Sequence, residues 1–283
     1  MNIYEETKFI IKKYGINANK SLGQNFLIDD EVVSKIIESA NITNEDLVIE
    51  IGPGLGTLTN ELLKKSKKVI VVELDERMIK ILKDRFSLYE NIEIINQDIL
   101  KVNLNEIIEK EKKETGIKNA KIVANLPYYI TTPIIMKLLE EKSDIETITV
   151  MIQKEVADRL CETPGGKQSG AITYTIYYYA EAEKVQKVPN TSFIPAPEVD
   201  SEVIKLKIRK EPPIQVKDEE RLFKIIKYAF MQRRKTLINA LSQCDIFKSK
   251  EEIKNILDSL GISEKIRGEA LTIQEFANIS NHI

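Results

Sequence analysis

Four consecutive residues near the middle of the chain carry groups suited to chemistry on an aromatic amine, namely Asn125, Leu126, Pro127 and Tyr128. The exocyclic nitrogen of adenine is a poor nucleophile because its lone pair is delocalised into the ring. Two acceptors directed at its hydrogens favour the pyramidal, nucleophilic form, and the Asn125 side-chain oxygen and the Leu126 carbonyl can supply them. Pro127 restricts the backbone next to that carbonyl, and Tyr128 can stack on the base. Positioning and electrostatics then carry the reaction, without a strong base.

The same four residues have a structural alternative, in which a strand ends at a proline turn and the tyrosine is buried. For an isolated match of four residues, that alternative is the better one. Their place in the chain favours a functional role, because they follow the fourth in a series of short apolar runs.

The apolar runs are separated by helical segments, and each is closed by a glycine or a polar residue. They cover residues 47–51, 68–74, 92–95, 121–124 and 146–152. Short buried strands that alternate with helices predict a parallel sheet with helices on both faces. Ligands of such sheets bind at the carboxyl ends of the strands. Gly52, Glu73, Asp98 and Asn125 all fall at these ends, which predicts one shared site.

A glycine-rich loop at residues 50–56 joins the first run to a helix. Gly52 and Gly54 permit a tight turn and let a ligand approach the backbone closely. An ordinary strand-to-helix turn is the structural alternative, and the glycine pattern by itself is a weak signal.

Acidic residues close the next two runs. Glu73 is placed to accept hydrogen bonds from both ribose hydroxyls, and Asp98 from the exocyclic amine of a cofactor adenine. This pattern suits any adenosine cofactor, including NAD. Further acid at Asp75 and Glu76 would repel a 2′-phosphate but tolerate a sulfonium cation.

The flanking segments complete the predicted architecture. Residues 3–14 are predicted as an amphipathic helix, and a second helix is expected to begin at Asp29 or Asp30. Residues 171–180 are ambiguous between strand and helix, whereas 185–188 and 203–208 are typical of strands. After the break at Pro212 and Pro213, residues 218–281 indicate several helices. We therefore expect domains at 1–211 and 212–283.

Composition excludes several classes of protein. The chain has 283 residues and a net charge of −2, so any nucleic-acid surface must be local. Cys161, Cys244 and His282 form neither a zinc cluster nor a disulfide framework. No stretch approaches the ~18 apolar residues of a membrane span, and the N-terminus does not resemble a signal peptide. We expect a cytoplasmic protein that acts as a monomer, without a metal and without a membrane partner.

Motifs spread over nearly the whole chain resemble the KsgA (RsmA) family of small-subunit ribosomal RNA adenine N6,N6-dimethyltransferases. The matching stretches are 22–29, 50–56, 97–98, 125–133, 193–201 and 232–237. The resemblance implies an α/β, Rossmann-like class I methyltransferase domain with a small all-α C-terminal domain. It implies transfer of two methyl groups from S-adenosylmethionine to N6 of each of two adjacent adenosines. These lie in a 3′-terminal hairpin loop of small-subunit rRNA within a pre-30S particle, which implies a role in small-subunit biogenesis.

The resemblance also assigns roles to residues. Cofactor contacts fall on Asn25, Leu27, Gly52, Gly54, Glu73, Asp98 and Asn125. Tyr128 and Phe193 would sandwich the flipped adenine, although Phe193 can also be a core aromatic in a proline-rich loop. Two departures from the family are a Lys/Glu-rich insert at 106–119, interpreted as a solvated helix extension, and Glu198, where many members have lysine.

The expected RNA contact lies in a segment with more basic than acidic residues. Residues 203–240 hold eleven Lys or Arg and four Asp or Glu, and Arg233, Arg234 and Lys235 form a cluster. Such a patch neutralises phosphates, although charge runs are usually solvated helix faces.

Two other functions stay open. One is an Erm-type methyltransferase that acts on large-subunit rRNA, and the motifs at 193–201 and 232–237 favour the KsgA type over it. The other is an assembly or transcription factor that keeps the fold without catalysis. Intact Asn125, Tyr128 and Glu73 argue against that loss.

Overall fold

The computed structural model describes residues 2–19 and 22–283, and the chain divides into two compact units. The first comprises the residues up to 157 together with 182–208, and the second comprises 158–181 together with 209–283. Within the described residues, no helix is both long and apolar enough to cross a membrane.

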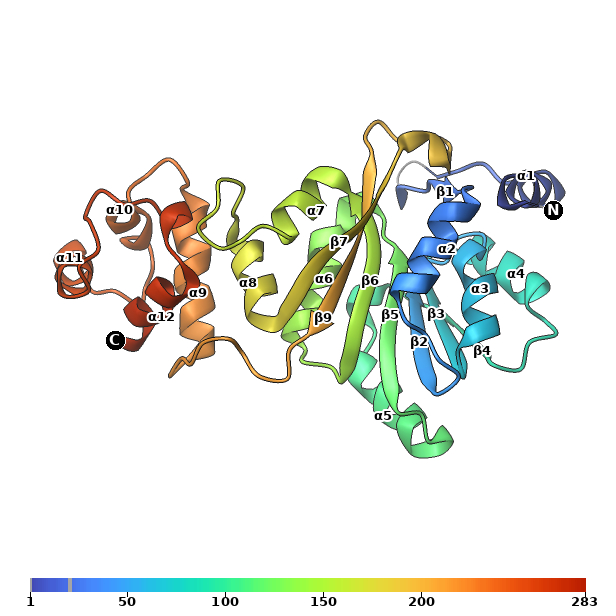
Figure 1. The fold of residues 1–283 in the computed structure, drawn as a ribbon, viewed down its shortest axis with the longest axis horizontal. Coiled ribbons are helices and arrows are strands. Elements are labelled where there is room, and N and C mark those ends of the chain that lie inside the picture. The colour runs from blue at the N-terminus through green and yellow to red at the C-terminus, as the bar shows by residue number, and fades with distance from the viewer. Residues whose placement is uncertain (1, 20–21) are drawn as a thin grey trace. The chain divides into compact units, whose positions relative to one another are not determined.

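Seven strands of the described residues form one sheet in the order β4-β3-β2-β5-β6-β9-β7 (Figure 1). Their bounds are β2 Asp46–Ile51, β3 Lys68–Glu73, β4 Ile92–Asn96, β5 Asn119–Asn125, β6 Ile145–Gln153, β7 Ala180–Val188 and β9 Ser201–Ile208. The five strands β2, β3, β4, β5 and β6 are parallel to one another, and β9 runs antiparallel to β6. The five predicted parallel strands are therefore confirmed.

The strand order creates a natural binding place. The chain runs outward from β2 to β3 and β4, then returns to place β5 on the other side of β2. Loops leave β2 and β5 in opposite directions at this point, so a crevice opens beyond the carboxyl ends of the two strands. Gly52 follows β2 and Asn125 ends β5, so both lie at this crevice.

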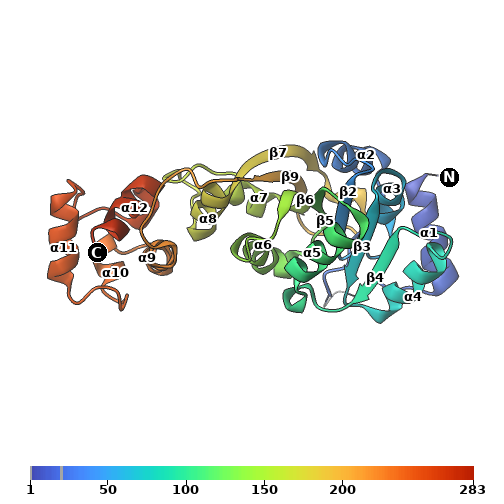
Figure 2. The ribbon, with the colours of Figure 1, turned by 90° about the horizontal axis from the view of Figure 1, so that it is seen from below.

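Helices cover both faces of the sheet. In Figures 1 and 2, α2 (Asp30–Ser39) and α3 (Thr57–Lys65) lie on one face, and α5 (Leu104–Thr115) and α6 (Thr131–Glu140) lie on the other. Two more helices belong to this unit, α1 (Ile3–Tyr14) and α4 (Glu76–Arg85), and the division between the units falls within α7 (Lys154–Leu160).

Local signals explain where these helices begin and what they bury. The carboxylate of Asp29 accepts the backbone N–H groups of Glu31 and Val32, so Asp29 is the N-cap of α2, one of the two predicted starts. The face of α2 that carries Val33 and Ile36 is buried against the sheet.

A second, two-stranded sheet joins parts of the chain that lie far apart in sequence. The short strand β1 (Phe26–Leu27) pairs antiparallel with β8 (Phe193–Ile194), so that Leu27 lies opposite Phe193. The 3₁₀ turn η4 (Asn190–Ser192) directly precedes β8, and two further 3₁₀ turns, η2 (Ile99–Lys101) and η3 (Tyr128–Ile130), follow β4 and β5. The pairing brings two of the sequence motifs, 22–29 and 193–201, into contact.

The insert at 106–119 forms most of α5, which confirms a helix there but not its full solvation. Glu111 is only 2% exposed, and its carboxylate lies 2.5 Å from the Lys68 amine. The helix is therefore tied to β3 by a partly buried ion pair.

The second unit is helical. It contains α8 (Ala171–Tyr179), α9 (Glu219–Met231), α10 (Leu237–Leu241), α11 (Lys250–Ser259), the 3₁₀ turn η5 (Gly268–Ala270) and α12 (Ile273–Asn281). The ambiguous stretch 171–180 is thus a helix up to Tyr179, and β7 begins at Ala180, earlier than the predicted 185.

The division of the chain differs from the predicted one in two segments, 158–181 and 209–211, which both belong to the helical unit. Residues 158–181 belong to the helical unit, although the prediction placed them in the first domain. The reason is packing: Tyr174 is fully buried in a cluster with Leu222 and Phe276. Its hydroxyl also donates a 2.5 Å hydrogen bond to the Leu271 carbonyl.

Candidate active site

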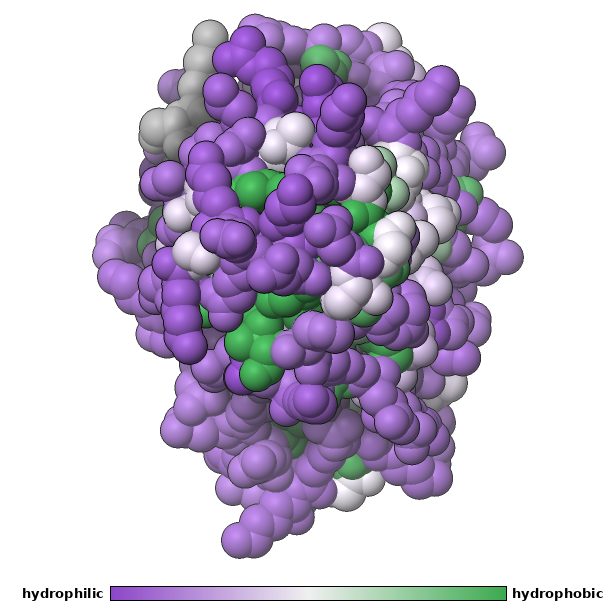
Figure 3. Space-filling view, turned by 90° about the vertical axis from the view of Figure 1, so that its left-hand side faces the viewer, coloured by the Kyte–Doolittle hydropathy of each residue, from purple (hydrophilic) through white to green (hydrophobic). Residues whose placement is uncertain are grey.

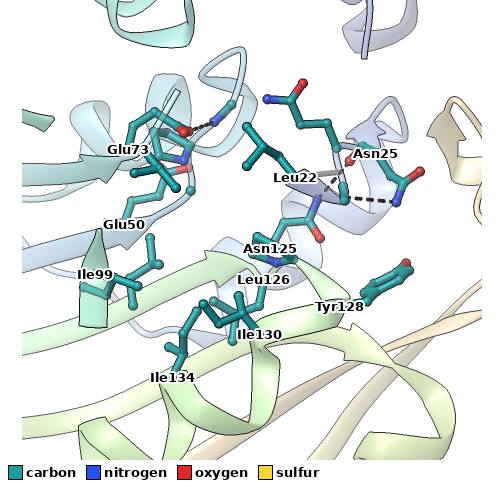
Figure 4. A pocket seen from close by; sticks show the side chains of 18 of the residues that line it. Leu22, Asn25, Glu50, Glu73, Ile99, Asn125, Leu126, Tyr128, Ile130 and Ile134 are labelled. Carbon is teal, nitrogen blue, oxygen red and sulfur yellow. Dashed lines mark hydrogen bonds between the residues drawn. The ribbon is translucent and has the colours of Figure 1, made fainter. Parts of the chain in front are cut away.

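A pocket at the carboxyl ends of the parallel strands brings together ten predicted site residues. Its volume is about 310 Å³, which is in the range of small-molecule sites. The ten residues are Asn25, Leu27, Gly52, Gly54, Glu73, Asp98, Asn125, Leu126, Pro127 and Tyr128. Figure 4 shows how the side chains converge on it.

The glycine loop at residues 50–56 packs against Phe26 and Pro127. Gly52 and Gly54 have φ values of +65° and +55°, a region that L side chains rarely adopt. A Cβ on Gly54 would lie 3.5 Å from the ring of Phe26, and one on Gly52 would lie 3.8 Å from Pro127. Side chains at either position would strain the backbone and narrow the pocket.

Glu73 is held in place by backbone donors. Gly54 N–H donates to its Oε2 at 3.2 Å, and Asp75 N–H donates to its Oε1 at 2.8 Å. The side chain is 8% exposed, and burial raises the pKa of this carboxyl above its usual range. Each oxygen keeps further acceptor capacity toward the pocket, as a pair of ribose hydroxyls requires.

Glu50 is a second acid in the pocket wall. It is 1% exposed and accepts a 2.6 Å hydrogen bond from the Thr59 hydroxyl. Burial raises its pKa to about 8, and the nearby Glu73 adds to the rise. None of the described residues that line the pocket is a lysine, arginine or histidine, so the pocket disfavours phosphates and suits a cationic ligand.

Asp98 is the third acidic residue that lines the pocket, with Glu50 and Glu73. Its Oδ1 accepts the backbone N–H of Leu100 at 3.0 Å, which begins the turn η2. The buried Ile99 follows it and also lines the pocket, so an aromatic ring placed here would meet an apolar surface beside a carboxylate.

Asn125 is oriented by a contact from a distant part of the chain. Its Nδ2 donates to the Asn25 carbonyl at 3.3 Å, and the Asn25 amide in turn donates to the Gly23 carbonyl. The Asn125 oxygen therefore points away from Asn25 and stays an acceptor (Figure 4). This is the orientation that a hydrogen-bond acceptor for an amino group requires.

The turn after Asn125 is held at several points. Leu126 N–H donates to the Met151 carbonyl at 3.1 Å, and the Pro127 carbonyl accepts bonds from Ile130 N–H and the Thr131 hydroxyl. Tyr128 is half-buried, and its hydroxyl shares a 2.6 Å hydrogen bond with Ser201. Burial raises the pKa of Tyr128, so its ring is a neutral stacking surface.

Phe193 is the one predicted catalytic residue that does not line the pocket. Its side chain is 3% exposed and packs in the core with Val33, Ile36 and Val203. The predicted sandwich of Tyr128 and Phe193 is therefore absent from the described structure, and Phe193 has the core role that was its alternative. Its contribution to the site is the β1–β8 pairing with Leu27.

Sequence reasoning also missed residues that contact the site. Ser201 is fully buried and orients Tyr128, and Tyr129 lines the pocket although it is 58% exposed. Leu74, which follows Glu73, adds an apolar surface that is 50% exposed. Tyr129 and Ser201 carried a signal, because they lie within the motif stretches 125–133 and 193–201, whereas Leu74 carried none.

The predicted RNA cluster lies in the helical unit, in the turn between α9 and α10 rather than in a helix. All three residues are exposed, but Arg233 donates to the Ser169 carbonyl at 2.9 Å and lies 3.4 Å from Glu269. Arg234 and Lys235 have no ion pair within the described ranges. Figure 3 shows a face of this unit that is mostly hydrophilic, with a few hydrophobic side chains among the polar ones.

Among residues 2–19 and 22–283, no group of three or more His, Cys, Asp or Glu is arranged to hold a metal ion.

Comparison with known proteins agrees with this geometry. The family model described as Ribosomal RNA adenine dimethylase matches residues 15–283. The chain is 49% identical to the Ribosomal RNA small subunit methyltransferase A of Geobacillus thermodenitrificans, over 97% of this chain and 94% of that protein. It is 48% identical to the protein of the same name from Clostridioides difficile, over 100% of this chain and 96% of the other.

Two solved structures have the same fold. A dimethyladenosine transferase from Plasmodium falciparum gives a TM-score of 0.75 at 27% identity, covering 90% of this chain and 95% of that one. The 23S rRNA methyltransferase ErmE gives 0.67 at 27% identity, covering 90% and 98%. The fold is thus that of class I methyltransferases with a helical second unit, and the chain belongs to the ribosomal RNA adenine dimethylase family.

Proposed function

We propose that this enzyme dimethylates N6 of two adjacent adenosines in a 3′-terminal hairpin loop of small-subunit rRNA, within a pre-30S particle. The orientation of Asn125 carries the proposal: its amide nitrogen is engaged by Asn25, which leaves its oxygen as an acceptor at the pocket. The names of the 48–49% identical relatives support the small subunit as the source of the RNA.

The pocket fits S-adenosylmethionine. Glu73 would accept the ribose hydroxyls, Asp98 the adenine amine, and the backbone at Gly52 and Gly54 would lie against the ligand. Asn25 and Leu27 close the pocket from the N-terminal segment. The cofactor, when bound, supplies an electrophilic methyl group on a cationic sulfur. This matches the described wall residues, which include Glu50, Glu73 and Asp98 and no lysine, arginine or histidine.

The residues of this chain act on the target adenosine. Asn125 Oδ1 and the Leu126 carbonyl would accept the two amino hydrogens, which localises the nitrogen lone pair for attack on the methyl carbon. Tyr128, held by Ser201, would stack on the flipped base. The bound cofactor would supply the methyl group and keep the sulfur as its neutral leaving group, and the proton of the acidic product nitrogen would leave to water. Catalysis rests on position and charge, so no group needs to take a proton before the transfer.

Two alternatives predict different products. An Erm-type enzyme would modify an adenine in large-subunit rRNA, and ErmE shares this fold at 27% identity. A non-catalytic assembly factor would modify none. The higher identity to small-subunit enzymes and the complete acceptor set favour the proposed function.

Mass spectrometry of rRNA from a deletion strain tests the proposal. Dimethyladenosine should be absent from the 3′ end of small-subunit rRNA and return with the wild-type gene, but not with Asn125→Ala. Loss of a large-subunit modification would support the Erm type, and unchanged rRNA would support a factor without catalysis. The cytoplasmic location and the monomeric state stay predictions.

RNA contact by the turn at 233–235 is part of the proposal, and the structure suggests a matched test. Arg234 and Lys235 are exposed, whereas Arg233 is anchored to Ser169 and Glu269. Changing Arg234 and Lys235 together to alanine should flatten the salt dependence of pre-30S binding by roughly 1.5 in log–log slope, the value for about two phosphate contacts. Arg233→Ala should change it less. An unaltered slope in the double variant would make the turn a structural feature.

A further inference from the structure

Tyr128 and Tyr129 are adjacent but lie in opposite environments. Tyr128 is half-buried, and its hydroxyl is bonded to Ser201. Tyr129 is 58% exposed, and within the described residues its hydroxyl has no hydrogen-bond partner. Both line the same pocket, so one tyrosine belongs to its wall and the other to its rim.

The Tyr129 ring is supported on one side. A Cβ built on Gly23 would lie 3.4 Å from Cδ1 of the ring and 3.7 Å from Cε1, so this edge of the ring packs against the glycine. Gly23 has a φ of +60°, a region in which a side chain is strained. The residue as a whole is 58% exposed, so the ring offers a flat apolar surface at the pocket entrance.

The backbone beneath Tyr129 is fixed. Ile130 N–H donates to the Pro127 carbonyl at 3.3 Å, and the Thr131 hydroxyl donates to the same carbonyl at 3.0 Å. Tyr129 is therefore held between Tyr128, whose hydroxyl is bonded to Ser201, and Ile130, whose N–H is bonded to Pro127. A preorganised ring loses little conformational freedom when it meets a ligand.

The RNA substrate would bring a second nucleobase to the rim of the pocket, beside Tyr129. When one nucleotide of a hairpin loop is flipped into the pocket, its covalent neighbour stays near the rim and loses its own stacking partner. We propose that Tyr129 is a nucleobase-binding site, on which the unpaired base next to the target adenosine stacks. This inference rests on the proposed function and adds a contact for a second nucleotide.

Single exposed aromatic residues are common on protein surfaces and need no explanation by themselves. The chain offers a matched comparison in Tyr4, which is 40% exposed on α1 and does not line the pocket. Only the tyrosine at the rim should affect the RNA substrate.

Steady-state kinetics on small-subunit particles from the deletion strain test the proposal, with Tyr129→Ala, Tyr129→Phe and Tyr4→Ala. Base–aromatic stacking of the usual strength predicts that Tyr129→Ala raises KM for the particle about 5- to 100-fold. Its kcat, its melting temperature and its affinity for S-adenosylmethionine should stay close to wild type. Tyr129→Phe keeps the ring and should restore KM, and Tyr4→Ala should not change it.

The outcomes separate this inference from the proposed function. An unchanged KM in Tyr129→Ala, with an active wild type, would overturn the stacking role and leave the methyltransferase activity in place. An equal rise of KM in Tyr129→Phe would assign the effect to the hydroxyl and also overturn it. An inactive wild type would overturn the proposed function, and this inference with it.

Discussion

The two ends of the pocket are built in different ways. At the end formed by Glu50 and Glu73, the holding contacts are local: Thr59 lies nine residues from Glu50, and Gly54 lies 19 residues from Glu73. At the end formed by Asn125 and Tyr128, the contacts span 100 residues to Asn25 and 73 residues to Ser201.

This difference suggests that cofactor binding depends mainly on the acidic end of the pocket and methyl transfer mainly on the amide end, the end formed by Asn125 and Tyr128. The acidic end is complete once β2, β3 and their loops have formed, so it belongs to the sheet. The amide end requires the N-terminal segment and the strand β9 to be docked as well. Each of its long-range hydrogen bonds contributes only about 0.5–1.5 kcal/mol to stability. Changes at the amide end should therefore alter methyl transfer with little effect on cofactor affinity.

Asn125→Ala gives the largest expected effect. Removing the acceptor oxygen should lower single-turnover methyl transfer by roughly 10²–10³, the scale for one positioned polar group. Affinity for S-adenosylmethionine, measured by calorimetry, should stay within about an order of magnitude, because removing one neutral hydrogen-bonding group has a small net effect on binding.

Asn96→Ala is the matched control. Asn96 also ends a strand and donates to a backbone carbonyl, that of Glu73 at 2.9 Å, but it does not line the pocket. It should keep most of the transfer rate. A fall in cofactor affinity as large as the fall in rate for Asn125→Ala would show that the two ends of the pocket are not separable.

The same contrast explains how much could be predicted from the sequence. The five parallel strands and their polar ends were predicted, because burial makes each strand a short apolar run. Glu73 is the last residue of β3, and Asp98 lies two residues after the end of β4. The acidic end is local in sequence, so its pattern is complete within residues 50–73.

The amide end could be predicted only in part. The strands β1 and β8 have two residues each, too few to carry a periodicity, so the sequence could not decide between a stacking role and a core role for Phe193. The bond from Tyr128 to Ser201 depends on the antiparallel addition of β9 to β6, which no local pattern encodes. Likewise, Tyr174 gave no sign that its segment packs with the helical unit.

Glu50→Gln tests the acidic end by itself. The folded-state pKa of about 8 lies above the ordinary 4.5, so between these values the folded protein holds a proton that the unfolded chain has lost. Glu50 therefore contributes stability that is fully present below pH 4.5 and is lost as pH rises through 8. The loss is up to about 1.4 kcal/mol per pH unit.

The glutamine variant removes that slope while it keeps the shape of the side chain. Urea unfolding from pH 5 to 9 should show the variant gaining stability relative to wild type as pH rises, with the remaining slope due in part to Glu73. Glu45→Gln, at an exposed carboxylate paired with Lys118, should follow the wild-type curve. Parallel curves for Glu50→Gln and wild type would contradict a neutral, buried Glu50.

Tyr128→Phe and Ser201→Ala give the smallest expected effect and test how the amide end is held. Each removes the same 2.6 Å hydrogen bond, worth about 0.5–1.5 kcal/mol, which corresponds to a loss of about 2- to 13-fold in single-turnover transfer. The double variant should lose no more than the larger single loss, because the two groups act through one bond. Losses that multiply would mean that Ser201 affects transfer by a route other than Tyr128. In that case the ring would be positioned by its packing alone, and the amide end would depend less on distant contacts than its geometry indicates.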